Sequence, residues 1–360
     1  MRHAYFHIPF CRNICSYCDF CKILYELNQT SEYLTALEAE VKDYYNNETL
    51  TSIYVGGGTP SVLSPAELQR LFKIINQLKR TSDCEITFEC NPEDITEVLI
   101  DILKLNGVNR LSIGIQSFNS EKLKFMERQA EFENLKNKIL MIRNKRINNI
   151  NLDLMYGIPG ESFDVLRHDL KMLLKLEPEH ISPYSLIIED YTKIKINGVA
   201  PLDEALEAKM YTYISKKLRK SGYRHYEISN YAKPGYESRH NLAYWENKEY
   251  YGFGLGAAGY LNGFRYENTK SLNDYSAGKY RLTQALVSKQ EMMEYEVMLG
   301  LRKIEGISLQ KFFDKYEINL QDVFPIKPLV RNKDLIYKDG YVYLNPEKIY
   351  LMNEILMKLL

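Results

Sequence analysis

The feature that most constrains the fold of this chain is an alternation of strand-like and helix-like segments over its first half. The strand-like segments are short and rich in β-branched and aromatic residues, and several are apolar throughout, which is typical of strands covered on both faces. They lie at residues 4–8, 52–56, 85–90, 110–115, 150–155 and 180–187. Strand–helix units in series predict parallel pairing with right-handed crossovers. We therefore expect an α/β fold, a partial (β/α)6 barrel of the TIM type.

The intervening segments carry helix boundary signals. The string Ser64-Pro65-Ala66-Glu67 combines an N-cap serine, a proline in the first turn and a glutamate that completes a capping box. Gly107 predicts the end of a helix that includes residues 98–105, and Ser162 predicts the start of a helix over residues 163–176.

Distinctive polar and glycine residues follow the strands at the point where each strand ends. They are Cys11, Cys15 and Cys18 after the first strand, residues 56–60 after the second, Glu89 and Asn91 after the third, Gln116 after the fourth, and Asp153 with residues 156–160 at the fifth. In parallel barrels the functional residues come from the carboxyl ends of the strands and the loops that follow them. A role in the core alone would not gather these residues at one end, so we expect one site there.

The pattern changes after about residue 271. Residues 291–301 and 308–316 have helical patterns, residues 336–343 predict a hairpin with an Asp339-Gly340 turn, and residues 346–360 predict an amphipathic helix. We expect two domains: residues 1–270, the partial barrel and its extension, and residues 285–360, a small helical, winged-helix-like domain with a hairpin.

The charge balance and the apolar runs limit the partners and the location. Lys and Arg number 47, as do Asp and Glu, so the chain is neutral and has no basic footprint for a nucleic acid. The start of the chain has no basic segment followed by an apolar stretch, and no run of about 18 apolar residues occurs. We expect a cytoplasmic protein. Loose membrane association and a homodimer stay open.

Three of the six cysteines form the motif Cys11-x3-Cys15-x2-Cys18. Three thiolates in so short a segment can bind three corners of a [4Fe–4S] cluster and leave the fourth iron open to an exchangeable ligand. A structural zinc site needs four ligands, usually as two separated pairs, and no second pair follows at that distance. We favour the cluster over zinc and over structural cysteines, and we expect Cys21 to lie outside the ligand set.

The motifs together resemble a known family. The strings are HIPFCRNICSYCDF, GGGTPS, ECNPE, RLSIGIQSF, NLDLMYGIPG and RHNLAYW, which occur in this order over residues 4–265. They resemble the radical S-adenosylmethionine superfamily, in the branch that contains the oxygen-independent coproporphyrinogen III oxidases and the HemW heme chaperones. The resemblance implies that S-adenosylmethionine chelates the open iron. Whether this chain also cleaves it, and so is an enzyme, stays open.

The resemblance implies a set of residues around S-adenosylmethionine. The first site would comprise Tyr5, Gly56, Gly57, Gly58, Thr59 and Glu89, and Gln116, Arg128 and Asp153 match residues around a second molecule. Glycines let backbone approach a ligand closely, although a glycine run also suits a tight turn at a strand end. Simpler roles are open to three of the charged residues: a solvated carboxylate for Glu89, a surface salt bridge for Arg128 and the orientation of a neighbouring loop for Asp153.

Two departures separate the chain from the oxidases. Phe20 stands where the oxidases carry a further cysteine, and only about ten residues precede Cys11, whereas the oxidases have a long N-terminal extension. The string RHNLAYW instead resembles the heme-associated HNxxYW motif of HemW-type proteins.

This motif contains groups that suit heme. The imidazole of His240 fits an axial position on heme iron, and Tyr244 and Trp245 offer flat faces to a porphyrin. Arg239 could bind a propionate. The alternative is a capping histidine beside a core tryptophan.

We therefore expect a [4Fe–4S] protein that binds S-adenosylmethionine and heme and passes heme to an acceptor, which we expect to be a respiratory hemoprotein. The alternative function is oxidative decarboxylation of coproporphyrinogen III or another radical reaction on a tetrapyrrole.

Overall fold

The computed structural model describes residues 2–360, and its contacts group them into two units. The first comprises residues up to Met210 together with Glu249–Ala285, and the second comprises Tyr211–Lys248 and Leu286–Leu360. Residues 211–248, which the sequence pattern placed in the first domain, thus group with the C-terminal residues. The sequence-based boundaries at 270 and 285 stay a prediction.

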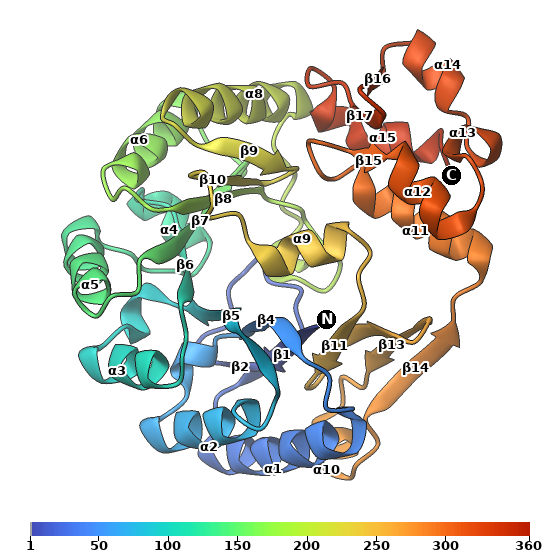
Figure 1. Ribbon diagram of the computed structural model, residues 1–360. Helices are drawn as coiled ribbons and strands as arrows, with labels where there is room; N and C mark the ends of the chain where they lie inside the picture. The colour runs from blue at the N-terminus through green and yellow to red at the C-terminus, as the bar shows by residue number, and fades with distance from the viewer. Residues whose placement is uncertain (1) are drawn as a thin grey trace. The chain divides into compact units, whose positions relative to one another are not determined.

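A parallel sheet forms the centre of the first unit (Figure 1). Its strands occur in the order β11-β1-β4-β5-β6-β7-β8, and every neighbouring pair is parallel. Their bounds are β1 (Arg2–Ile8), β4 (Leu50–Gly57), β5 (Arg80–Cys90), β6 (Arg110–Gln116), β7 (Asn149–Tyr156), β8 (His180–Ser185) and β11 (Tyr250–Phe253). All six predicted strands are present. The seventh, β11, was not predicted because it follows β8 only after a long insertion.

Helices connect the parallel strands and lie along the outside of the sheet in Figure 1. They are α1 (Leu27–Tyr44), α2 (Pro65–Ile75), α3 (Glu97–Leu105), α4 (Ser120–Phe125), α5 (Phe132–Asn144) and α6 (Phe163–Leu174). The predicted capping box at Ser64 forms, with the Glu67 carboxylate accepting from the Ser64 N–H at 2.8 Å. Ser162 caps α6 as predicted. The partial (β/α)6 barrel is confirmed.

The sheet continues beyond β11 with antiparallel strands. These are β12 (Ala258–Leu261) and β13 (Phe264–Asn268). Strand β14 (Arg281–Leu286) lies next to β13 at the edge of the sheet, and α10 (Leu272–Ser276) precedes it along the chain. Glu40 of α1 is fully buried and accepts hydrogen bonds from Gly254, Asn268, Tyr275 and Arg281, which fastens this extension to the barrel helix.

The remaining short elements are β2 (Phe10–Cys11), β3 (Ile23–Leu24), η1 (Pro60–Val62), η2 (Pro92–Asp94) and α7 (Lys193–Ile196), and α8 (Glu204–Lys220) runs from the first unit into the second.

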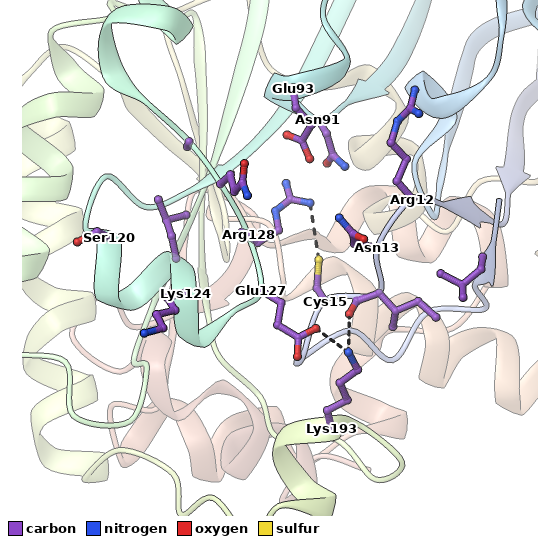
Figure 2. Close-up of a pocket in the computed structure, with 15 residues that line it drawn as sticks. Arg12, Asn13, Cys15, Asn91, Glu93, Ser120, Lys124, Glu127, Arg128 and Lys193 are labelled. Carbon is purple, nitrogen blue, oxygen red and sulfur yellow. Dashed lines mark hydrogen bonds and ion pairs between the residues drawn. The ribbon is translucent and has the colours of Figure 1, made fainter.

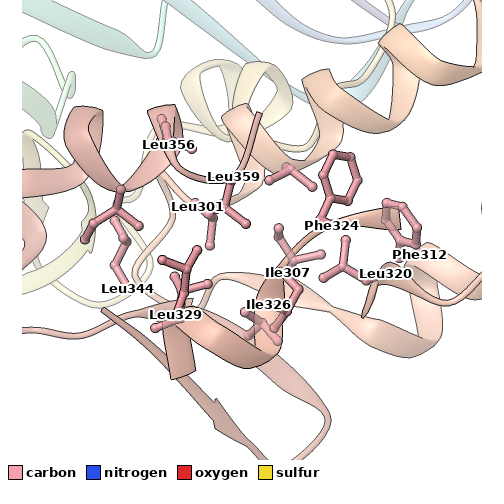
Figure 3. Close-up of a cluster of buried hydrophobic side chains, with 14 of the residues drawn as sticks. Leu301, Ile307, Phe312, Leu320, Phe324, Ile326, Leu329, Leu344, Leu356 and Leu359 are labelled. Carbon is pink, nitrogen blue, oxygen red and sulfur yellow. The ribbon is translucent and has the colours of Figure 1, made fainter. Parts of the chain in front are cut away.

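The second unit has a core of its own, which Figure 3 shows around Leu301, Phe312 and Leu329. Its elements are β9 (Arg224–Glu227), β10 (Asn230–Ala232), α9 (Arg239–Trp245), α11 (Lys289–Gly300), β15 (Ile307–Ser308), α12 (Leu309–Tyr316), α13 (Leu320–Val323), α14 (Ile326–Arg331), β16 (Leu335–Lys338), β17 (Tyr341–Leu344), η3 (Ile349–Leu351) and α15 (Met352–Met357). The predicted hairpin forms between β16 and β17, and both Asp339 (φ 53°) and Gly340 (φ 78°) are left-handed, as its turn requires.

The predicted helix over residues 346–360 is wrong in its extent. Asn345 organises a turn there by accepting the N–H of Glu347 on its side chain and the N–H of Lys348 on its carbonyl, so regular α-helix begins only at Met352. Within residues 2–360 no helix combines the length and the apolar content needed to cross a membrane.

Candidate functional site

The cysteine loop leaves β1 at the carboxyl edge of the parallel sheet. Strands β2 and β3 pair in parallel and close the loop at its base, with the N–H of Tyr25 donating to the carbonyl of Cys11 at 2.9 Å. Cys11, Cys15 and Cys18 all line one hollow of about 410 Å³. The structure thus brings together the three cysteines that the spacing singles out.

The other cysteines near the loop lie apart from these three. Cys21 does not line the hollow, and its Sγ faces Gly256, 3.0 Å from where a Cβ on that residue would lie. Cys90 borders the hollow, but its thiol is buried, and the charges that act on it are those of Asp94 and Glu89, not of the loop. The geometry therefore offers three loop thiols and no fourth from Cys21.

The three thiols match the ligand type and number that a [4Fe–4S] cluster takes from a protein when its fourth iron stays open, and all three border the same hollow. Thr59 donates a 3.4 Å hydrogen bond to Sγ of Cys11, and Arg128 donates one of 3.7 Å to Sγ of Cys15. Burial raises the pKa of Cys11 to about 11, so metal binding there must release a proton.

The glycine loop at the end of β4 lies directly against the chain that enters the cysteine loop. Gly58 approaches the backbone of Pro9 so closely that a Cβ would lie 2.8 Å from its carbonyl carbon. Gly57 has φ +117°, and a Cβ on it would lie 2.7 Å from the ring of His7. Gly57, Gly58 and Thr59 line the hollow, whereas Gly56 does not. A Cβ on Gly56 would instead lie 2.7 Å from the carboxylate carbon of Glu89.

Two carboxylates stand in the wall of the hollow. Glu89 accepts from the hydroxyl of Tyr54 at 2.7 Å and from the N–H of Gly57 at 3.1 Å. Asp153 accepts from the side-chain amide of Asn151 at 2.7 Å. Burial raises the pKa of Glu89 to about 7 and that of Asp153 to about 6. Neither is an ordinary solvated carboxylate, and each can change its ionisation when a cationic ligand arrives.

Tyr5 does not reach the hollow. Its hydroxyl bonds to Nδ1 of His7 at 2.9 Å, and Nε2 of His7 donates to the carbonyl of Cys21 at 2.7 Å. Burial lowers the pKa of His7, so the ring is neutral and Tyr5 donates to its bare Nδ1. His7 was not predicted from the sequence as a residue of the site. The sequence feature that could have indicated His7 is its position four residues before Cys11. In the structure its ring faces Gly57.

Gln116 and Arg128 also line the hollow. Gln116 has φ +63° and lines the hollow beside Gly114. Arg128 donates to the carbonyl of Gly114 as well as to Cys15, so its partners are internal groups and not a surface carboxylate. A second hollow of about 1000 Å³, shown in Figure 2, shares Cys15 and Arg128 with the first and is walled by Arg12, Lys124 and Lys193.

The predicted heme residues lie on α9, in the second unit. His240 is 1% exposed, and its Nε2 bonds to the hydroxyl of Tyr244 at 2.9 Å. The helix cap is Ser238, which accepts from the N–H of Asn241, so the capping role considered for His240 is wrong. Trp245 is half-buried under the guanidinium of Arg302, 5.5 Å from the ring centre, and Arg239 is exposed. An iron atom at Nε2 would have to displace the Tyr244 hydroxyl.

Comparisons with known proteins give the family. The radical SAM superfamily matches residues 5–173, and the HemN C-terminal domain matches residues 287–351. The heme chaperone HemW of Lactococcus lactis is 39% identical over 93% of this chain and 91% of its own length, and that of Bacillus subtilis is 38% identical over 99% and 98%. The coproporphyrinogen III oxidase HemN of Escherichia coli has the same fold, with a TM-score of 0.87 over 99% of this chain and 89% of its own, at 22% identity. The chain belongs to the HemW family of radical SAM proteins.

Proposed function

We propose that this chain is a heme chaperone, which binds heme and passes it to an acceptor hemoprotein. The observation that carries the proposal is similarity to proteins named heme chaperone HemW at 38% and 39% identity over nearly the whole chain, including α9. Phe20, which stands where the oxidases carry a further cysteine, supports it. Its side chain borders the hollow and is 64% exposed, so this position supplies an apolar ring in place of a thiol.

We propose that the hollow at the strand ends holds a [4Fe–4S] cluster and S-adenosylmethionine. When bound and reduced, such a cluster would be able to supply an electron to the sulfonium of S-adenosylmethionine. The chain's own part is to hold and orient. Cys11, Cys15 and Cys18 provide the thiolates, the backbone at Gly57 and Gly58 admits the ligand closely, and Glu89 and Asp153 provide negative charge for a cationic ligand.

The heme site is proposed on α9. Because His240 is buried against Tyr244, iron ligation at Nε2 requires a local rearrangement in which the hydroxyl of Tyr244 gives way. Trp245 and the exposed Arg239 then provide a flat apolar surface and a cation for a propionate. The acceptor is proposed to be a respiratory hemoprotein. Transfer in the cytoplasm belongs to the same proposal, whereas loose membrane association and a homodimer stay open.

One experiment on one sample tests this function. Anaerobically reconstituted protein is titrated with heme and then assayed with coproporphyrinogen III, S-adenosylmethionine and a reductant. If the protein is a heme chaperone, its Soret band should saturate at a fixed number of hemes per chain. No decarboxylated product of coproporphyrinogen III should form. His240→Ala should weaken or shift the band, whereas His168→Ala, which removes an exposed histidine, should leave it unchanged.

The second candidate is a radical enzyme acting on a tetrapyrrole. The specific observation in its favour is the hollow itself, where three thiols, a glycine loop and two carboxylates converge. Such an enzyme would consume coproporphyrinogen III and form 5′-deoxyadenosine in proportion. Sustained decarboxylation by the wild-type protein would overturn the chaperone proposal.

A further inference from the structure

A buried ion cluster forms around Lys122 of α4. Its charged side chains do not line either hollow. The ammonium of Lys122 lies 2.6 Å from Oε1 of Glu161, 3.1 Å from Oδ2 of Asp169 and 2.6 Å from the carbonyl of Met155. The three charged side chains are 4%, 1% and 0% exposed. Each of the three N–H groups of the lysine thus has an acceptor, and two carboxylates share one cation away from water.

The carboxylates of this cluster hold two loops at the strand ends. Asp169, on α6, accepts from the N–H of Phe118 at 2.7 Å and from the hydroxyl of Ser117 at 2.7 Å. Glu161 accepts from the N–H of Ile158 at 3.1 Å. The first loop begins at Gln116, and the second follows β7. The ions therefore fix the backbone immediately after the left-handed Gln116.

Helix α4, which carries Lys122, contacts the cysteine loop. At its carboxyl end, the carbonyl of Phe125 accepts from the hydroxyl of Ser16 at 2.8 Å, and that of Met126 accepts from the N–H of Ser16 at 3.4 Å. Arg128 follows and bonds to Cys15 and Gly114. Figure 2 shows α4 and the segment after it forming one wall beside Cys15. Direct contacts thus connect the buried ions to the walls of the hollow.

The energetics argue for a role beyond stability. A buried ion cluster is weakly favourable at best, because desolvation of the charges offsets their attraction, and apolar residues of similar volume often stabilise a fold as well or better. Its fixed hydrogen bonds, however, give a loop one geometry. We propose that Lys122, with Glu161 and Asp169, is a positioning residue that holds Gln116 and Arg128 in the geometry for S-adenosylmethionine. The inference rests on the proposed binding of S-adenosylmethionine in the hollow.

The test compares graded variants of the cluster with a less buried ion pair at the other end of the sheet. Ser117→Ala removes the hydroxyl that donates to Asp169 and accepts from the N–H of Asn119. Asp169→Asn removes one charge, and Lys122→Met combined with Glu161→Gln and Asp169→Asn removes all three charges without stranding one. Arg143→Met is the control. Arg143 forms a two-point pair with Glu179, at 3.0 and 3.2 Å, at the amino end of β8, opposite the site.

Each reconstituted protein is measured for iron content, melting temperature, the dissociation constant for S-adenosylmethionine and the change that this ligand causes in the spin-resonance spectrum of the reduced cluster. The cluster variants should keep about four irons per chain. They should bind S-adenosylmethionine about tenfold more weakly or worse, with a diminished spectral change. Arg143→Met should lower the melting temperature and leave affinity and spectrum unchanged.

The possible results distinguish the positioning role of the cluster from the proposed binding of S-adenosylmethionine in the hollow. Unchanged affinity and spectrum in Ser117→Ala and Asp169→Asn would overturn the positioning role, and so would an equal loss of affinity in Arg143→Met. If the charge-free triple variant does not fold, Ser117→Ala and Asp169→Asn still decide. Failure of the wild-type protein to bind S-adenosylmethionine would instead overturn the proposed function of the hollow, and the positioning role with it.

Discussion

The carboxylate of Glu89 accepts the backbone N–H of Gly57 at 3.1 Å. This bond joins the end of β5 to the glycine loop at the end of β4. The other carboxylate oxygen of Glu89 accepts from the hydroxyl of Tyr54, so both oxygens are held in place beside the hollow. Glu89 thus holds the glycine loop together with the backbone bonds from Gly58 to Ile8 and from Thr59 to Phe10, and it places a titratable charge where a cationic ligand would bind.

The first prediction concerns the pH dependence that Glu89 gives to stability. Burial raises its pKa from 4.5 to about 7, so the folded state holds the proton more tightly than the unfolded state. Stability from this group is fully present below pH 4.5 and is lost as the pH rises through about 7, by on the order of 3 kcal/mol as an upper bound. Glu89→Gln should remove that loss. Urea unfolding of both apoproteins at pH 5 and pH 8 measures it, and parallel changes in the two proteins would contradict the assignment.

The second prediction concerns Gly57. Gly57→Val should abolish the change that S-adenosylmethionine causes in the spectrum of the reduced cluster, because the new side chain would collide with His7 at 2.7 Å. The positive φ adds a backbone cost of about 1 kcal/mol or more. Gly198→Val is the matched control, since Gly198 also has a positive φ (67°) but nothing lies within 4 Å of its Cβ position. An unchanged spectral response in Gly57→Val would remove the glycine loop from the site.

The third prediction concerns the ligand set of the cluster. Replacing Cys11, Cys15 or Cys18 by Ala should abolish the cluster, because each removes one of three thiolates. Cys21→Ala and Cys90→Ala should each retain about four irons, since the first thiol faces Gly256 and the second lies apart from the loop. Iron and sulfide analysis after anaerobic reconstitution measures this. Loss of the cluster in Cys21→Ala would show that the ligand set is wrong.

The fourth prediction uses the contact between His240 and Tyr244. Tyr244→Phe removes the hydroxyl that occupies Nε2 at 2.9 Å and should therefore strengthen heme binding, whereas His240→Ala should weaken it. Heme titration followed at the Soret band gives both dissociation constants, and analysis of acid-labile sulfide confirms that the [4Fe–4S] cluster is retained. Weaker binding in Tyr244→Phe would identify Tyr244 as a heme ligand. Unaltered binding in His240→Ala would move the ligand elsewhere, with His225 as the next candidate.

The sequence determined the features that depend on local spacing. Short β-branched and aromatic runs between helix-like segments predicted the six parallel strands, and Ser64, Asp339 and Gly340 predicted a helix start and a turn through their own backbone preferences. Because parallel strands carry their carboxyl ends to one edge, the order of strands and polar residues along the chain predicted one site there, although Gly56, Pro60 and residues 156–160 do not line the hollow. The three cysteines followed from their spacing alone.

The tertiary structure decided which way side chains point and what they meet. Tyr5 and Gly56 carry the right residue types, yet neither lines the hollow, because Tyr5 bonds to His7 and Gly56 faces Glu89. Residues 211–248 group with the C-terminal residues through contacts far apart in sequence. Lys122, Glu161 and Asp169 are 39 and 8 residues apart along the chain, and only the packing of α4 against α6 and the loop after β7 makes them one cluster. Spacing along a strand or helix is fixed by backbone geometry, whereas such long-range pairs depend on how several elements pack at once.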